Sequence, residues 1–322
     1  MPRTEAHWPL RDRLRIRHLH LLSELGDVAN IRRAAIRLHM TQPGASKLLK
    51  EAEETFGCQL FDRSRRGITP NEAGLVAIRR AKLLLQALEG AREEIASVAD
   101  DPIGRVLVGA YPVAVSLLLP MTIIRLRANH PRILVTIEEG TNSVLLPALQ
   151  RGEVDCVVGR LPEQLPPTLE VRHLYDEPVV VVCGPHHHLV GAPSPSLAQL
   201  AAEEWILPPL DHPFRMRLEA LFSVAGLPPP RVIMESASSL MNASTLQSTR
   251  AVAMMPVGTA RFLETWQAIG ILPVSLGAAH PPVVVLQRKN IDPSFALRKF
   301  LEALDTSTGQ LNAPYLSDVS AI

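Results

Sequence analysis

Polar side chains with the chemistry to read DNA bases lie together on one helix predicted near the start of the chain. Thr41 is a favourable N-cap and Pro43 is tolerated in a first turn, so the spacing predicts a helix that runs to about Thr55. Its apolar residues would face inward, which leaves a polar outer face formed by Gln42, Ser46, Lys47 and Lys50. Glutamine pairs with adenine, lysine with guanine or phosphate, and serine with either kind of site. These residue types predict contacts with double-stranded DNA.

The segments on either side of this helix predict a helix-turn-helix followed by a hairpin. Apolar residues at helical spacing predict a first helix over residues 15–26, and Asn30 is the predicted N-cap of a second. Two short helices, a tight turn and a third helix are typical of a helix-turn-helix. Residues 60–68 read as a short hairpin whose arginines would lie on the phosphate backbone. The predicted DNA-binding set is Arg32, Arg33, Thr41, Gln42, Pro43, Ser46, Lys47, Lys50, Arg63, Arg65 and Arg66.

Charge is distributed unevenly along the 322 residues, whose formal net charge is only +1. Residues 1–82 contain 16 Lys and Arg against 9 Asp and Glu, a local charge of +7, while residues 83–322 carry −6. Because attraction to phosphate acts over about a Debye length, the local charge governs nucleic-acid binding. The near-neutral total therefore does not exclude a DNA-binding module. The alternative, a small helical core with a solvated charged face, stays open at this point.

A long helix is predicted to follow the hairpin. Thr69-Pro70-Asn71-Glu72 reads as a capping box with proline at the first helical position. Behind it, apolar residues alternate spacings of four and three, which is a heptad seam of about three repeats. The partner of this seam is either a second copy of the chain or the body of the same chain. The predicted dimerisation residues are Ala77, Ala81, Leu84, Leu88, Ala91 and Ile95.

The rest of the chain predicts two α/β lobes. Strands over residues 106–110, 133–138 and 154–159 alternate with helices over 115–128 and 142–150, the signature of a parallel sheet. A second run follows, with strands at residues 178–183, 205–207, 231–234 and 251–255, helices at 214–225, 238–249 and 257–268, then a strand at 283–286 and a closing helix at 295–304. The tail after Thr306 is polar and predicted to be loose.

Chain crossings near residues 160–177 and 272–282 imply a cleft between the lobes. Ligands favour the carboxyl ends of parallel strands and the N-termini of helices. These positions predict a small-molecule site formed by Tyr111, Pro112, Ser116, Thr141, Asn142, Ser143, Arg160, His212, Phe214, Arg215 and Pro256. Thr141 and Ser143 have helix capping as an equal alternative, Ser116 an ordinary helix position, and Arg215 a solvated surface position. Arg160 leaves a buried strand, so it would meet either a ligand or an interlobe salt bridge.

Other chemistries find little support. No motif of a hydrolase, P-loop nucleotidase, dinucleotide-binding enzyme or zinc protease occurs, so no enzyme is expected. His186-His187-His188 resembles a metal tract, but it follows Gly184-Pro185 on a turn with no carboxylate nearby in sequence, and neither a metal nor a cofactor is predicted. Cys156 and Cys183 lie in apolar strands, where thiols are usually inert. The sparse cysteines fit a reducing cytosol, and neither a signal peptide nor a membrane span is predicted.

The N-terminal stretch resembles the winged helix-turn-helix of LysR-type transcriptional regulators. The resemblance rests on residues in order over about 45 positions: Ala34-Ala35, Leu38, Thr41-Gln42-Pro43, Phe56-Gly57, Leu60-Phe61, Arg63 and Thr69 to Gly74. The chain departs from the family pattern at Gly44, where Ala or Ser is usual, and at Ala52-Glu53, where Leu-Glu is usual. Glycine slightly weakens a helix, but neither departure falls on a DNA-facing position.

The resemblance implies an all-α winged helix-turn-helix with a linker helix, followed by an α/β effector domain of two Rossmann-like lobes similar to periplasmic solute-binding proteins. The implied domains are residues 1–70, the linker 71–100, and the effector domain 101–306, with a tail at 307–322. Lobe I would comprise about 101–160 and 280–306, and lobe II about 175–275. The implied partners are promoter DNA, a small-molecule effector, further copies of the chain in a dimer or tetramer, and RNA polymerase, in the cytoplasm at the nucleoid.

The effector half looks closest to the branch of the family that responds to sugars such as galactose, with the branch for aromatic acids as its neighbour. Arg250-Ala251-Val252-Ala253 stands where many members have a Gly-rich segment, so the family's effector contacts do not transfer residue by residue. The alternative from a different class is a cytosolic solute-binding module whose N-terminal helices serve only in protein contacts. The sequence does not decide between activation and repression.

Overall fold

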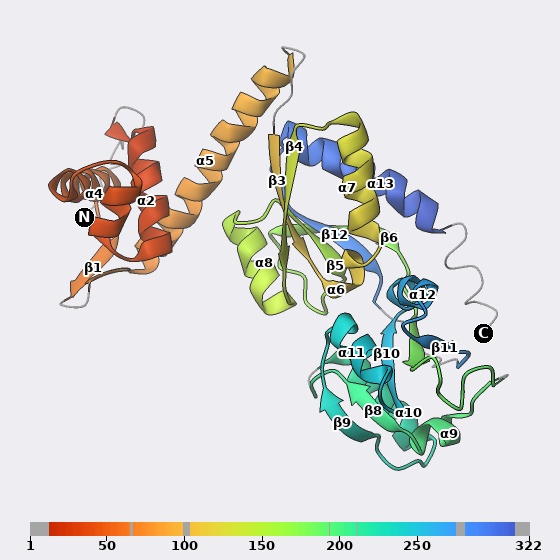
Figure 1. The fold of residues 1–322 in the computed structure, drawn as a ribbon. Helices are drawn as coiled ribbons and strands as arrows, with labels where there is room; N and C mark the ends of the chain where they lie inside the picture. The colour runs from red at the N-terminus through yellow and green to blue at the C-terminus, as the bar shows by residue number, and fades with distance from the viewer. Residues whose placement is uncertain are drawn as a thin grey trace. The chain divides into compact units, whose positions relative to one another are not determined.

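Figure 1 draws the computed structural model, which describes residues 13–64, 67–98, 104–192, 194–210, 212–274 and 281–312. The chain forms two compact units, and each is considered by itself. The first contains the described residues within 1–103 together with 147–154 and 292–295. The second contains those within 104–146, 155–291 and 296–322.

The first unit begins with three helices and a hairpin that lead into a long helix. Its elements are α2 (Ile16–Val28), α3 (Ile31–Arg37), α4 (Gln42–Phe56), β1 (Phe61–Ser64), β2 (Gly67–Pro70) and α5 (Glu72–Val98). The predicted caps are confirmed, since the Asn30 side chain accepts from the N–H of Arg33 and that of Thr41 from the N–H of Gly44. Gly57 ends α4 with φ 71°, a left-handed conformation that glycine adopts at little cost.

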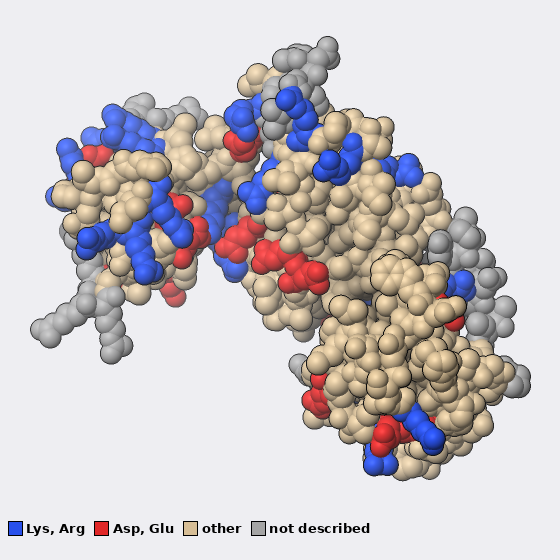
Figure 2. All heavy atoms as spheres, in the orientation of Figure 1, with Lys and Arg blue, Asp and Glu red and all other residues tan. Residues whose placement is uncertain are grey.

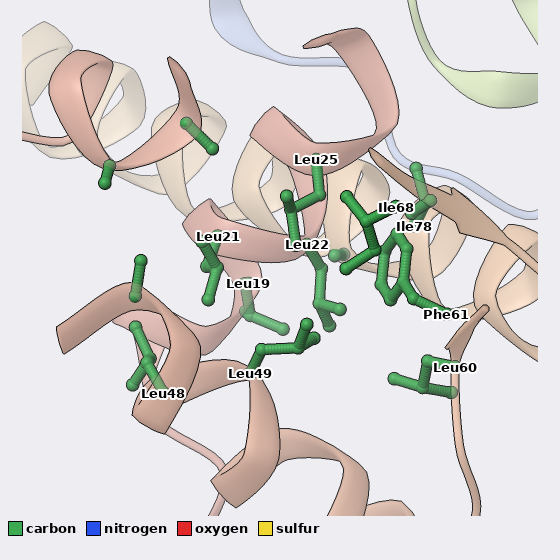
Figure 3. Close-up of a cluster of buried hydrophobic side chains, with 14 residues drawn as sticks. Leu19, Leu21, Leu22, Leu25, Leu48, Leu49, Leu60, Phe61, Ile68 and Ile78 are labelled. Carbon is green, nitrogen blue, oxygen red and sulfur yellow. The ribbon is translucent and has the colours of Figure 1, made fainter. Parts of the chain in front are cut away.

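Aliphatic side chains hold these helices together. Figure 3 shows the cluster, in which leucines of α2 and α4 lie with residues of the hairpin and of α5. Leu22 and Leu25 from α2 and Leu49 from α4 are fully buried, and Ile78 brings α5 into the same core. Truncating one such leucine to alanine typically costs ~2–5 kcal/mol of stability. The core therefore fixes the orientation of α4 within the unit.

The predicted start of the long helix is wrong by two residues. Thr69 and Pro70 belong to β2, where Thr69 pairs with Asp62 across the hairpin. Asn71 caps the helix instead, because its Oδ1 accepts from the N–H of Gly74 at 2.9 Å and its Nδ2 donates to the carbonyl of Gln59 at 2.9 Å. The pairing of the hairpin keeps Thr69 extended and so removes it from the capping position.

The second unit contains two five-stranded sheets. The first sheet has the order β4-β3-β5-β12-β6 and is formed by β3 (Gly104–Ala110), β4 (Ile133–Glu139), β5 (Cys156–Arg160), β6 (Leu169–Tyr175) and β12 (Val283–Arg288). The parallel pairing predicted for its first three strands is confirmed. β12 returns antiparallel between β5 and β6, and β6 lies within the segment predicted as a crossing.

The second sheet has the order β11-β7-β10-β8-β9. Its strands are β7 (Val179–Cys183), β8 (Glu204–Leu207), β9 (Arg231–Glu235), β10 (Ala251–Pro256) and β11 (Gly270–Leu272). Successive valines of β7 enter opposite cores, as the alternation of a strand requires. One face packs on α9 (Leu197–Ala201) and α10 (Pro213–Val224), and the other on α11 (Ser239–Leu246) and α12 (Val257–Thr265). The sequence predictions did not include α9 or β11.

Two predicted helices differ from the structure. The helix predicted over residues 115–128 is divided into α6 (Pro112–Val115) and α7 (Leu118–Asn129), because Leu117 between them has ψ −58° with φ −138° and interrupts the helix. The last helix, α13 (Phe295–Asn312), continues past Leu304, so the loose segment predicted from residue 307 is wrong as far as Asn312. The hydroxyls of Ser307 and Thr308 donate to carbonyls one turn earlier, which lets these polar residues be buried within the helix. Residues 313–322 of the predicted tail lie outside the described part of the chain.

The first half of α8 (Asn142–Arg151) belongs to the second unit, and its residues from Pro147 onward belong to the first. None of the helices that the structure describes is long and apolar enough to cross a membrane.

Candidate functional site

The predicted recognition face of α4 is solvent-exposed. Gln42, Lys47 and Lys50 are exposed and Ser46 is half-buried, whereas Leu48 and the other core residues of the helix face inward. Thr41 and Pro43, at the N-terminal end of the helix, are exposed as well. The N-terminal turn of a recognition helix is the part that contacts base edges. The structure therefore leaves the predicted base-reading side chains free to enter a groove.

Further cations surround this face. Arg32 and Arg33 on α3 are exposed. Figure 2 shows Lys and Arg gathered over the helices of the first unit. The backbone of Arg63 lies in β1 opposite Ile68, while its side chain and the whole of Arg65 and Arg66 lie outside the described residues. Arginines at these positions suit contacts with phosphates, which fix the register of a protein on DNA.

Two acidic side chains position α4, and the sequence predictions included neither of them. Glu53 accepts from the N–H groups of Leu60 and Phe61 at 2.9 and 3.3 Å, so it joins α4 to the hairpin. Glu51 approaches Nε2 of His18 at 3.4 Å, and His18, which is buried on α2, accepts from the N–H of Arg15 through Nδ1. Glu53 lies at the Ala52-Glu53 departure from the family pattern, so the acidic half of the usual Leu-Glu is retained there and holds the hairpin.

The predicted seam of α5 divides between two environments. Ala81 is buried in the core of the first unit and Ala77 packs against that core. Beyond them Leu84 is 49% exposed, Leu88 47% and Ile95 74%, and Ala91 is exposed. The body of the same unit, one of the two partners left open by the sequence, therefore covers the start of the seam. The later positions remain available for a second copy.

In the second unit, Arg160 lies where the two interlobe crossings meet. Its Nη2 donates to the carbonyl of Glu177 at 2.8 Å and its Nη1 to the carbonyl of Pro281 at 2.7 Å. Its guanidinium carbon lies 5.0 Å from the centre of the Phe214 ring, a cation–π contact with α10. Burial lowers the pKa of Arg160 to about 10, although the nearby Glu177 carboxylate opposes this. Arg160 therefore joins the two crossings through backbone carbonyls and contacts α10 through a ring.

Glu177 is a buried carboxylate that the sequence predictions missed. Its Oε1 accepts from the N–H of Gly258 at 2.7 Å, in the first turn of α12. Desolvation raises the pKa of Glu177, and the hydrogen bond from Gly258 and the charge of Arg160 offset this only in part. Beside it, the hydroxyls of Ser116 and Thr259 lie 3.1 Å apart. These contacts join α12 of one lobe to the crossing and to Ser116, at the end of α6 in the other lobe.

Among the buried polar atoms that have no hydrogen-bond partner in the described part of this unit, two belong to uncharged side chains. One is the hydroxyl of Tyr111, which follows β3 and is 8% exposed, and the other is Oδ1 of Asn242 on α11, which is 4% exposed. Burial raises the pKa of Tyr111, so its hydroxyl is a neutral donor. An unpaired buried polar atom costs roughly 1–3 kcal/mol, which a bound ligand can recover. Asn242 was not among the predicted residues.

The remaining predicted ligand residues have partners of their own or lie on the surface. Arg215 is buried, and its hydrogen bonds to Glu219 and then Glu235 raise its pKa. Nδ1 of His212 caps α10 by accepting from Phe214. The exposed predicted positions are Pro112, Thr141, Asn142 and Ser143, and Pro256 ends β10 half-buried. The hydroxyls of Thr141 and Ser143 lie 2.9 Å apart at the start of α8.

The histidine tract meets a carboxylate only in the folded chain. Glu203 lies 3.1 Å from Nε2 of His188 and 3.5 Å from Nε2 of His187. Nδ1 of His187 accepts from the N–H of Leu189, so its Nε2 carries the proton and donates to the carbonyl of Arg250 at 2.9 Å. With both nitrogens engaged, His187 acts as a structural tie rather than a metal ligand. Burial also raises the pKa of Cys183 to about 12, which makes this thiol unreactive.

Both parts of the chain match known protein families. Residues 16–75 match the family model described as a bacterial regulatory helix-turn-helix protein of the lysR family, and residues 99–308 match the LysR substrate binding domain. The HTH-type transcriptional regulator GbpR of Azospirillum brasilense is 33% identical over 305 residues, which cover 94% of this chain and 89% of that protein. The regulator PcaQ of Agrobacterium fabrum is 28% identical over 301 residues, 93% and 96% of the two chains.

Solved structures share the fold. A full-length OxyR variant from Pseudomonas aeruginosa superposes with a TM-score of 0.68 at 24% identity, covering 92% of this chain and 94% of that one. Full-length CbnR, solved in complex with its target DNA, gives a TM-score of 0.63 at 20% identity, with 91% and 100% coverage. The winged helix-turn-helix and the α/β effector fold predicted from the sequence are thereby confirmed.

Proposed function

We propose a role in gene regulation for each of the two units, on the premise that the chain belongs to the LysR family. The chain is a DNA-binding transcriptional regulator with an effector-binding domain, and it is not an enzyme. The match of residues 16–75 to the family's helix-turn-helix overturns the alternative of a solute-binding module whose N-terminal helices serve only in protein contacts. The observation that supports our assignment of the DNA-reading residues is the exposed polar face of α4.

In this proposal α4 enters the major groove and its first turns read the bases. Gln42, Ser46 and Lys47 meet base edges, and Lys50 with the arginines of α3 and of residues 63–66 holds phosphates. The local charge of +7 over residues 1–82 supplies the attraction that is independent of sequence. The protein acts on promoter DNA, in the cytoplasm at the nucleoid, and RNA polymerase is its expected partner there.

The effector site in this proposal lies among the residues where the two lobes meet, around Tyr111, Ser116 and Arg160. The unpaired hydroxyl of Tyr111 supports it, because a ligand would supply the missing partner. Asn242 adds a second unpaired atom on the other lobe, although it was not predicted. Binding there would change how the lobes close.

The charges around this site favour a neutral effector that carries hydroxyl groups. Arg160 already donates to two carbonyls, and Arg215 is paired with two carboxylates. The first turn of α12, a position suited to an anion, already holds Glu177. The Tyr111 hydroxyl and Oδ1 of Asn242, which have no partner among the described residues, are neutral atoms, and this suits a sugar better than an organic or aromatic acid. The resemblance of this half to the sugar-responsive branch of the family agrees with this choice, and an acid is the second candidate.

We expect the chain to form dimers through α5 and tetramers from two such dimers. The exposed Leu84, Leu88 and Ile95 support this, since large apolar side chains on one helix face favour pairing with a second helix. A dimer places two recognition helices one DNA turn apart.

Genomic footprinting tests the proposal, because it identifies bound promoters and the neighbouring genes indicate the effector. We expect discrete protected sites with pseudo-twofold symmetry, and protection without any sequence preference would contradict the assignment of base-reading residues. A thermal-shift screen of neutral sugars against matched sugar acids and aromatic acids then tests the effector class. Stabilisation by the acids alone would contradict the choice of a neutral ligand.

A further inference from the structure

The linker helix α5 presents three faces with three different environments. One face enters the core of the first unit through Ile78 and Ala81, and a second carries the exposed Leu84 and Leu88. A third face is covered by residues 147–154 and 292–295, which belong to the same compact unit. The positions on this third face recur every four residues, at Lys82, Gln86 and Gly90.

Lys82 joins two carboxylates that are far apart in sequence. Its Nζ lies 2.7 Å from Oδ1 of Asp27 near the end of α2, and 3.2 Å from Oε1 of Glu153 after α8. The side chain of Lys82 is only 14% exposed. Burial alone would lower its pKa, but the hydrogen bonds and charges of Asp27 and Glu153 outweigh burial and raise it. Lys82 is therefore a charged ammonium held between two segments.

The contact continues along the helix and is closely packed. One turn beyond Lys82, the side-chain amide of Gln86 donates to the carbonyl of Gly152. Gly152 has φ +77°, a left-handed conformation that favours glycine, and a Cβ there would lie 2.5 Å from Oε1 at the end of the Gln86 side chain. A further turn along, Gly90 faces Ser294, where an added Cβ would make an ordinary van der Waals contact at 3.5 Å. The contacts along three turns distinguish this face from an isolated surface ion pair.

We propose that Lys82 is a relay between α8 and the DNA-binding helices. α8 begins with Asn142 and Ser143, two candidate effector contacts, and leads directly into Glu153. A displacement of α8 therefore moves Glu153, and the shared ammonium of Lys82 passes the displacement to Asp27 at the end of α2. The relay rests on the regulatory function proposed above, because it gives that function a physical connection between its two binding events.

Hydrogen exchange in the full-length chain, without DNA or effector, tests whether Lys82 holds residues 147–154 to the end of α2. We expect Lys82→Met to speed amide exchange about five-fold both at residues 147–154 and at the end of α2, and Lys82→Arg to restore most of the protection. Asp27→Asn should loosen mainly the end of α2, and Glu153→Gln mainly residues 147–154, because Lys82 keeps its other carboxylate in each case. The matched control is Lys299→Met, which removes the surface pair with Glu302 at 2.9 Å.

Unchanged exchange at both segments in Lys82→Met would contradict the proposal that Lys82 connects them. If Lys82→Met does not fold, the two carboxylate variants decide, since equal loosening of both segments in each would indicate general destabilisation and overturn it as well.

The transmission is tested with a DNA fragment recovered by genomic footprinting. By the reciprocity of linkage, a bound fragment should change exchange at residues 147–154 in the native chain. In Lys82→Met we expect the fragment to bind within about two-fold of the native affinity while that change at residues 147–154 disappears. A variant that binds and still transmits the change would overturn the relay. Failure to recover any specific fragment would instead count against the proposed function.

Discussion

The Oε1 atom of Glu177 accepts a hydrogen bond from the backbone N–H of Gly258 at 2.7 Å, so a carboxylate from the interlobe crossing lies on the first turn of α12. A Cβ at Gly258 would lie 3.1 Å from the same oxygen, so a larger residue there would require the Glu177 carboxylate to shift slightly. The protein thereby fills a helix N-terminus, a position that favours negative charge, with its own side chain. The contact ties the two lobes together and makes their junction sensitive to the ionisation of one buried group.

Glu177→Gln should flatten the dependence of stability on pH. Burial raises the pKa of Glu177 above its usual value of 4.5, so the folded chain binds this proton more tightly than the unfolded chain. The contribution of Glu177 to the free energy of unfolding is therefore fully present below its pKa in the unfolded chain. This contribution is lost as the pH rises through its pKa in the folded chain. Urea unfolding between pH 4 and 8 should show a smaller decline in the variant. Glu163→Gln, at an exposed position, is the control, and parallel declines in all three proteins would contradict the prediction.

Tyr111→Phe should weaken effector binding without lowering the stability of the fold. The Tyr111 hydroxyl is buried without a partner among the described residues, so its removal should leave the effector-free melting temperature unchanged or slightly raised. Once a stabilising ligand is found in the thermal-shift screen, its affinity for the variant should fall by about ten-fold, the loss of one hydrogen bond. A clear drop in the effector-free melting temperature would mean instead that the hydroxyl supports the fold.

Gln42→Ala and Lys50→Ala should weaken DNA binding in different ways. Gln42 is assigned to a base edge, so its loss should lower specific affinity by about 1–3 kcal/mol with little change in non-specific binding. Lys50 is assigned to a phosphate, so its loss should weaken all sequences alike and reduce the salt slope by about 1. Gel-shift titrations over a range of salt concentrations measure both quantities. A loss of specific affinity alone in Lys50→Ala, together with a smaller salt slope in Gln42→Ala, would refute the two assigned roles.

Leu84→Asp combined with Leu88→Asp should give monomers that bind DNA poorly. The two side chains are half exposed in the first unit, so charging them leaves the core of that unit intact but places carboxylates in a helix pair. Sedimentation velocity measures the assembly, and Val224→Asp, at an 89% exposed position on α10, controls for added charge on an apolar surface site. An intact dimer in the double variant would exclude this face as the interface.

The sequence by itself determined the features that depend on neighbours along the chain. The caps at Asn30 and Thr41, the hairpin of residues 60–68 and the parallel strands β3, β4 and β5 all follow from local residue types and spacing. The exposed polar face of α4 follows in the same way, since helical periodicity alone assigns its inner and outer positions.

The tertiary structure decided what depends on residues far apart in sequence. It paired Arg160 with carbonyls 17 and 121 residues away, brought Glu203 to the histidine tract, and placed Lys82 between Asp27 and Glu153. It also kept Thr69 in the hairpin, buried Ser307 in a longer helix, and left the hydroxyl of Tyr111 without a partner among the described residues. No local pattern encodes these outcomes, because the partner of a buried charge or polar atom is set by which segments the fold brings within hydrogen-bond distance.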